Sequence, residues 1–165
     1  MTGLPVPTGV GVPVGSFYPR RVTYEQLTLR AARPTELVKV LEFWQRAAEN
    51  DNRPVDTGAA VGALVRRDPE ALILAVDDGE IVGTVIAGWD GWRCHLYRLA
   101  VAPHRRRAGI GGRLIAAAEE RFRRLGATRV DAMVLDANDG AHGAWAAHGY
   151  RRQDEWSRWV KPLAE

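Results

Sequence analysis

The chain has 165 residues, enough for one domain with a hydrophobic core that needs no covalent cross-links. Hydrophobic residues make up 46% and charged residues 26% of it, which is typical of a globular protein, and no apolar run approaches the roughly 20 residues that a bilayer-spanning helix requires. The net charge of +3 is spread along the chain without the basic stripe and interleaved aromatic residues of a nucleic-acid surface, so neither a membrane nor a nucleic acid is expected as a partner.

Residues 1–24 are rich in proline, glycine and valine and are predicted to form a flexible arm. Apolar residues within the arm leave open that it packs on a second copy of the chain in a homodimer. Residues 1–15 lack the basic start and the continuous apolar core of a secretory signal, so a cytoplasmic protein is expected. Residues 25–165 are predicted to form a single domain.

The domain begins with a short predicted strand over residues 27–30, which is followed by two helices. Pro34 starts the first helix, in which four apolar residues share one face at helical spacing: Leu37, Val40, Leu41 and Trp44. A polar loop then leads to a weaker helix over residues 57–67.

Three strands follow as a predicted antiparallel meander. Residues 71–76 and most of 81–89 are apolar throughout, which is typical of strands covered on both faces of a sheet. Asp78-Gly79 joins these two strands, and Asp90-Gly91 joins the second to a third strand that ends at Val101. The Asp-Gly pair is a strong signal for a hairpin.

A glycine-containing turn, residues 105–112, lies between the meander and a helix that runs to about Leu125. A strand, a tight turn and a helix N-terminus place backbone N–H donors at the positive end of a helix dipole. Gly109 and Gly111 lack Cβ atoms, so a phosphate can approach the main chain closely, and the arginines of the turn add positive charge. The turn is therefore interpreted as a cradle for a pyrophosphate.

The spacing of glycines and lysines distinguishes this turn from two other phosphate-binding motifs. A dinucleotide-binding fingerprint requires a glycine at position 114, where the chain has leucine, and no acidic ribose partner follows at a suitable distance. A P-loop ends in Gly-Lys-Ser/Thr, and the only lysines of the chain are Lys39 and Lys161.

The remaining elements follow the long helix. Gly126 is suited to its C-cap, and residues 130–135 form the next predicted strand. Because a helix crosses between this strand and the preceding one, the two are expected to run parallel. A short helix over residues 138–148 and a closing pair of strands, 150–154 and 156–161, complete a mixed sheet of six to seven strands with about four helices.

Three segments resemble motifs of the GNAT N-acetyltransferase superfamily. Arg106-x-x-Gly109-x-Gly111 is similar to its acyl-CoA loop, and residues 99–103, Leu-Ala-Val-Ala-Pro, are similar to the strand end before that loop. Residues 138–150 resemble its closing helix, and the order of predicted elements is similar to its fold over residues 27–161. The resemblance implies an α/β (α+β) fold whose sheet splays between the fourth and fifth strands.

The resemblance also implies that acetyl-CoA, the acyl donor, lies in the gap between strands 96–101 and 130–135. Main-chain N–H groups near Ala100 would then polarise the thioester carbonyl, and no metal is expected to take part. The residues implied to bind acetyl-CoA are Leu99, Ala100, Val101, Arg106, Arg107, Ala108, Gly109, Ile110, Gly111, Gly112 and Asn138, with Arg105 as an alternative source of charge.

The implied reaction is direct attack of a primary amine on the acetyl thioester in a ternary complex. Few amines are neutral at pH 7, so a general base is useful. The family often carries a glutamate on the strand before the loop, and His95 is the residue at the comparable position here. A hydrogen-bonded strand histidine without a catalytic role is the alternative. Asp90 is a second candidate base, and an ordinary role in a hairpin turn is its alternative.

Trp145 departs from the family pattern, which frequently has a tyrosine there to protonate the leaving thiolate. An indole N–H donates a hydrogen bond but is no acid at physiological pH. Either the thiolate leaves with the help of water or of Trp145, or this protein is a slow or specialised member. Strand alternation predicts that Tyr97 shares a face with His95 and Leu99, from which it also reaches the site.

The acceptor is expected to be a small-molecule or peptide amine. The candidates for binding it are Trp44, Asp56, Trp89 and Asp90, with Arg53 as a further one. Cys94, the single cysteine, excludes internal disulfides, and strand alternation turns it away from His95, so it is not expected to act as a nucleophile. The other histidines lack metal-ligand spacing: His104, His142 and His148.

Two other functions compete with an acetyltransferase. One is a non-catalytic acyl-CoA-binding or regulatory module that kept the loop and lost the acid at position 145. The other is a nucleic-acid-binding protein, whose affinity would fall steeply with salt.

Overall fold

The computed structural model describes residues 27–47 and 55–163. The arm predicted at residues 1–24 and the candidate Arg53 lie outside these described residues. One sheet contains five strands in the order β1 (Thr28–Ala31), β2 (Leu72–Asp77), β3 (Glu80–Trp89), β4 (Cys94–Val101) and β5 (Val130–Ala132). Neighbouring strands are antiparallel from β1 to β4, whereas β4 and β5 run parallel. The mixed sheet predicted from the sequence is confirmed.

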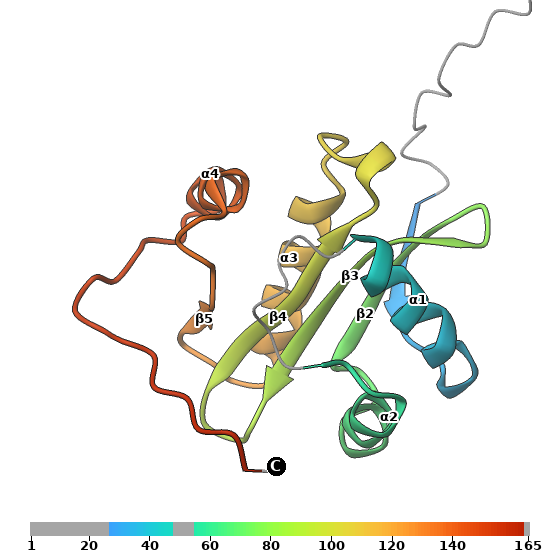
Figure 1. The fold of residues 1–165 in the computed structure, drawn as a ribbon, viewed down its shortest axis with the longest axis horizontal. Coiled ribbons are helices and arrows are strands. Elements are labelled where there is room, and N and C mark those ends of the chain that lie inside the picture. Colours follow the sequence, from blue (N-terminus) through green and yellow to red (C-terminus); the bar gives the residue numbers. More distant parts are fainter. Residues whose placement is uncertain (1–26, 48–54, 164–165) are drawn as a thin grey trace, which may run out of the picture.

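Helices cover both faces of this sheet (Figure 1). A 3-10 turn at Pro34–Glu36 leads into α1 (Leu37–Ala47), and α1 packs on one face together with α2 (Gly58–Arg67). On the other face lies α3 (Ile110–Arg124), and α4 (Asp139–Ala147) lies on the β5 side of the sheet. Among the described residues, no helix is both long and apolar enough to reach across a lipid bilayer.

Two hydrophobic cores, one on each face, explain why the middle strands are apolar throughout. On the α3 side, the helix buries the stripe Ile110, Leu114, Ala118 and Phe122. The opposite core buries the inner faces of α1 and α2 against β2, with Trp44 and Leu74 at its centre. The helix stops at Arg124, close to the predicted end at about Leu125, and Leu125 itself is 40% exposed.

The C-terminal segment differs from the prediction. β5 ends at Ala132 rather than at position 135, and residues 150–163 contain no strand. In this segment Arg152 pairs with Asp136 at 3.1 Å, and both side chains are exposed. A strand requires a neighbour that supplies its ladder of hydrogen bonds, and the three residues of β5 offer little edge for one. The described residues therefore contain five strands rather than six to seven.

Candidate active site

The glycine-containing turn, where the sequence predicts a cradle, leads into the N-terminus of α3. Gly109 is its N-cap with a φ of 73°, and Arg107 also has a positive φ, 60°. The first main-chain bond of the helix runs from Arg113 N to Gly109 O, at 3.1 Å. The N–H groups of Ile110, Gly111 and Gly112 precede that bond, so a ligand or water has to satisfy them. This arrangement fits an anion such as a diphosphate.

The three arginines of the turn have different surroundings. Arg105 pairs with the buried carboxylate of Asp77 at 2.5 Å, which ties the turn to the end of β2. Arg106 is exposed, and its Nε donates to Val101 O at 3.4 Å. Arg107 is exposed as well. Arg106 and Arg107 are thus better placed than Arg105 to add charge beside the cradle.

β4 and β5 separate before β4 ends. Their register contains three pairs, Cys94↔Val130, His95↔Asp131 and Leu96↔Ala132. β4 continues to Val101, and no part of β5 pairs with residues 97–101. The expected splay between the fourth and fifth strands is therefore present, and one side of Leu99–Val101 is open to an extended ligand.

A β-bulge interrupts β4 at this opening. Ile86 pairs with Tyr97 and Thr84 pairs with Ala100, so two residues of β4 lie opposite one residue of β3. Arg98, the first of these two, has a φ of 50°. A side chain of β3 stabilises the bulge, because Thr84 Oγ1 donates to Arg98 O at 2.9 Å.

The bulge corrects one prediction about side-chain direction. Leu99 packs with Leu96 in the core on the α3 side, because the extra residue reverses the alternation of side chains beyond Tyr97. The prediction that Leu99 shares a face with His95 and Tyr97 is therefore wrong. His95 and Tyr97 do lie near each other, with ring centroids 5.9 Å apart.

His95 has a partner that the sequence analysis did not identify. Its Nδ1 lies 2.5 Å from Asp131 Oδ1, and both side chains are partly exposed, at 30% and 45%. The contact follows from the register of the parallel strands β4 and β5, which places His95 opposite Asp131 and which the sequence does not specify. Burial, and to a lesser degree the Asp131 carboxylate, raises the pKa of the nearby Tyr97 phenol.

The third predicted catalytic residue, Trp145, lies on the other side of the sheet from His95 and Tyr97. It packs against the core on the α3 side, in edge-to-face contact with Tyr150 at 4.8 Å between ring centroids. The Tyr150 hydroxyl donates to Glu119 Oε1 at 3.1 Å. Burial and this carboxylate raise the pKa of Tyr150 far above its ordinary value, and its ring packs against the core on the α3 side.

The end of α4 contacts the start of α3. Asn138, a predicted cofactor contact, is the N-cap of α4, and its Oδ1 accepts from Ala141 N at 3.0 Å. At the other end of the helix, the His148 ring lies against Gly112, where a Cβ atom would collide with it. A side chain at position 112 would therefore have to displace the exposed His148 ring.

The four acceptor candidates form two separate pairs. Trp44 is only 2% exposed, and Asp56 accepts from Arg98 Nη2 at 2.5 Å, with the Arg98 guanidinium 5.7 Å from the Trp44 ring. Trp89 and Asp90 lie at the other end of β3. Asp90 Oδ1 accepts from the main-chain N–H groups of Trp92 and Arg93 at 2.7 and 2.6 Å, and these bonds lower its pKa.

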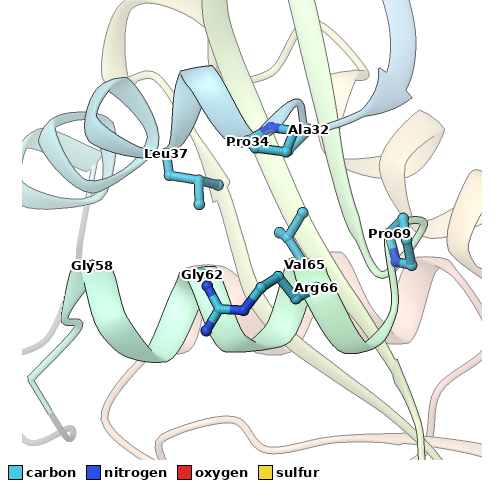
Figure 2. A pocket seen from close by; sticks show the side chains of 8 residues that line it. All are labelled: Ala32, Pro34, Leu37, Gly58, Gly62, Val65, Arg66 and Pro69. Carbon is cyan, nitrogen blue, oxygen red and sulfur yellow. The ribbon is translucent and has the colours of Figure 1, made fainter.

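An apolar pocket of about 460 Å³ lies elsewhere, between the start of α1 and α2 (Figure 2). Its lining residues are Ala32, Pro34, Leu37, Gly58, Gly62, Val65, Arg66 and Pro69. None of them belongs to the predicted cofactor, catalytic or acceptor residues. The predicted site is instead the open side of β4 together with the N-terminus of α3.

A mixed sheet that splays between two parallel strands, with a helix N-terminus at the end of the first, defines an acyl-CoA N-acyltransferase fold. Residues 28–150 match the model of the Acetyltransferase (GNAT) family, and the chain belongs to this family. It is an acetyltransferase.

Known proteins agree with this assignment. An acetyltransferase of Photorhabdus laumondii is 31% identical over 113 residues, which are 68% of this chain and 78% of the relative. The aminoglycoside N-acetyltransferase AAC(6')-Iy, solved in complex with CoA, has a TM-score of 0.67 at 19% identity, covering 82% of this chain and 94% of that one. An aminoglycoside acetyltransferase from an uncultured soil metagenomic sample, in complex with sisomicin, has a TM-score of 0.68 at 17% identity, covering 86% and 99%. The two structural likenesses concern the fold.

Proposed function

We propose that this chain transfers the acetyl group of acetyl-CoA to a primary amine by direct attack within a ternary complex. One observation supports the proposal most strongly: the open side of Leu99–Val101 and the cradle of α3 lie at the same end of β4. A pantetheine arm fits the open strand as an additional strand, and a diphosphate fits the helix N-terminus. Membership of the family and the CoA complex of AAC(6')-Iy support acetyl-CoA as the donor.

In this proposal the main chain does most of the binding. The N–H groups of residues 107–112 hold the diphosphate, and the exposed Arg106 and Arg107 add charge. Leu99, Ala100 and Val101 present their backbone to the pantetheine arm. Asn138 orders the start of α4 beside the opening, since it caps that helix.

The acceptor must lose a proton, because a lysine-like amine with a pKa of about 10.4 is almost entirely charged at pH 7. We assign His95 as the proton acceptor, since its ring lies on the partly exposed face of β4 beside the opening. Tyr97 has a raised pKa and stays protonated, so it donates a hydrogen bond rather than accepting the proton.

The leaving group needs little help. Acetyl-CoA supplies a thioester whose thiolate, with a thiol pKa near 8.5, leaves without a strong acid. Trp145 is proposed to donate a hydrogen bond at most, because its indole cannot give up a proton at this pH. The presence of tryptophan at position 145, where the family frequently has a tyrosine, favours the second candidate, a module that binds acetyl-CoA without turnover.

A panel of amines separates the two candidates. The chain is mixed with acetyl-CoA and with a polyamine, an aminoglycoside, a free amino acid or a peptide with a free N-terminus, and released thiol is measured. Aminoglycosides are included because two proteins of similar fold are named aminoglycoside acetyltransferases. Thiol release with one class supports the transferase and identifies the acceptor. Tight binding of acetyl-CoA without release from any amine supports the binding module.

Substitution of Gly109 tests the cradle directly. Gly109→Glu places a carboxylate where the diphosphate is proposed to bind, so the Kd for acetyl-CoA is expected to rise by about 100-fold or more. Gly126→Glu is the matched control, because Gly126 also has a positive φ, 81°, and nothing lies within 4 Å of its added Cβ. Calorimetric titration that finds the same Kd for both variants would exclude the cradle.

A further inference from the structure

His95 and Asp131 form one of the three residue pairs that join β4 to β5, so their side chains lie on the same face of the sheet. The next pair, Leu96↔Ala132, is the last before the strands separate. The two side chains therefore lie at the base of the opening in which the acyl donor is proposed to bind. Their contact, Nδ1 to Oδ1 at 2.5 Å, joins residues that are 36 positions apart in the sequence.

The chemistry of this contact determines which ring nitrogen carries the proton. An ionised carboxylate only accepts hydrogen bonds, so the contact requires a proton on Nδ1. In the neutral imidazole this leaves Nε2 with its lone pair. Nε2 is then the atom that can take a proton from a substrate.

We infer that Asp131 is a positioning residue for the proposed reaction: it holds His95 in the Nδ1–H tautomer and stabilises the imidazolium that forms at Nε2. The inference rests on the proposed function. One proton moves from the acceptor ammonium to Nε2, which frees the nitrogen lone pair that forms the new C–N bond. The C–S bond of the thioester breaks, its electron pair leaves on the CoA thiolate, and this thiolate takes the second proton that the nitrogen loses. The positive charge on the ring lies against the Asp131 carboxylate, and the proton later passes to water.

Among the described residues, other polar and charged groups near the ring come from three segments. Asp90 lies in the turn after β3, and the uncharged Tyr97 phenol lies beside the ring on β4. Arg158, in the C-terminal segment, acts electrostatically on Tyr97. Since Asp90 already accepts two main-chain hydrogen bonds, Asp131 is the carboxylate in direct contact with the ring.

Asp131→Asn tests the inference, because an amide keeps the size of the side chain but removes its charge. With the best amine from the panel, kcat is expected to fall by about 10- to 100-fold. The KM for acetyl-CoA is expected to stay within about twofold, since the donor is proposed to bind through the main chain of Leu99–Val101 and of the cradle. Asp136→Asn, at a side chain that is 81% exposed, is the control and is expected to leave kcat and the KM for acetyl-CoA unchanged.

A double-mutant cycle and a spectroscopic readout make the test decisive. Asp131→Asn in the His95→Gln background is expected to change kcat by less than about twofold further, since a positioning residue acts only through its histidine. Nitrogen-15 NMR of the free protein is expected to show Nδ1–H for His95, one of four histidines, and a changed tautomer in Asp131→Asn. An additive loss in the cycle, or an unchanged tautomer, overturns the inference. If no amine supports thiol release, the proposed function fails, and the NMR result still decides whether Asp131 sets the tautomer.

Discussion

Thr84 is a single polar side chain that connects the core to the proposed site. It is fully buried, accepts from Trp44 Nε1 at 2.8 Å and donates to Arg98 O at 2.9 Å. Through these two bonds, α1 supports the bulge of β4. Trp44, a candidate for acceptor binding in the sequence, therefore bears on the site through Thr84, because its own ring is buried.

Thr84→Val retains the shape of this side chain and removes its hydrogen bonds. The free energy of unfolding is expected to fall by about 1–3 kcal/mol, because Trp44 Nε1 and Arg98 O lose their buried partners. Urea unfolding measures this change, with Thr28→Val on the exposed face of β1 as the control. Equal free energies of unfolding for the two variants would show that the two hydrogen bonds of Thr84 do not contribute to stability.

The packing of α3 against β3 operates at the scale of elements. A Cβ at Gly83 would lie 2.9 Å from Leu114 Cδ1 and 3.0 Å from Ile110 Cγ2, so helix and strand touch without an intervening side chain. This close approach sets how far the N-terminus of α3 lies from the end of β4. This contact therefore helps to position the cradle relative to the open strand.

Gly83→Ala is expected to destabilise the protein by about 1–3 kcal/mol, because the added methyl group overpacks this interface. It is also expected to weaken acetyl-CoA binding, since α3 must move outward. Gly143→Ala, in α4 with nothing within 4 Å, is expected to stabilise by about 0.5–1 kcal/mol. Thermal unfolding of both variants tests this contrast, and a neutral Gly83→Ala would mean that the interface adapts.

Arg121 connects the parts of the whole molecule. It is a buried residue of α3, and its guanidinium donates to Ala87 O in β3 at 2.9 Å and to both carboxylate oxygens of Asp68 at 2.6 Å. Asp68 caps the end of α2, which packs on the opposite face of the sheet. One side chain thus joins the helix layers on the two faces.

Arg121→Met is expected to lower the free energy of unfolding by about 2–4 kcal/mol, because it leaves the Asp68 carboxylate and the Ala87 carbonyl without this partner. Arg124→Met, at a side chain that is 59% exposed, is the control and is expected to change stability by less than about 0.5 kcal/mol. Chemical denaturation of the two variants measures the difference. Similar midpoints would contradict a connecting role for Arg121.

Much of the fold was predictable because its signals are local. Asp78 and Gly79 both have positive φ values, 48° and 78°, as the predicted tight hairpin turn requires. Gly109 adopts the left-handed conformation at the start of α3, and the helix stripe behind it is buried. Each of these features depends on residues within a few positions of one another, so the sequence alone determines it.

Tertiary structure decided the rest, because it depends on contacts between distant parts of the chain. The bulge at Arg98 depends on Thr84 and Trp44, and the pairing of His95 with Asp131 depends on the register of two parallel strands. Residues 150–161 have a sequence suited to strands, yet no neighbouring strand supplies a hydrogen-bond ladder for them. Local preference specifies the turns and the helix ends, whereas register and packing specify which strands form and which side chains meet, and the proposed site depends on the latter.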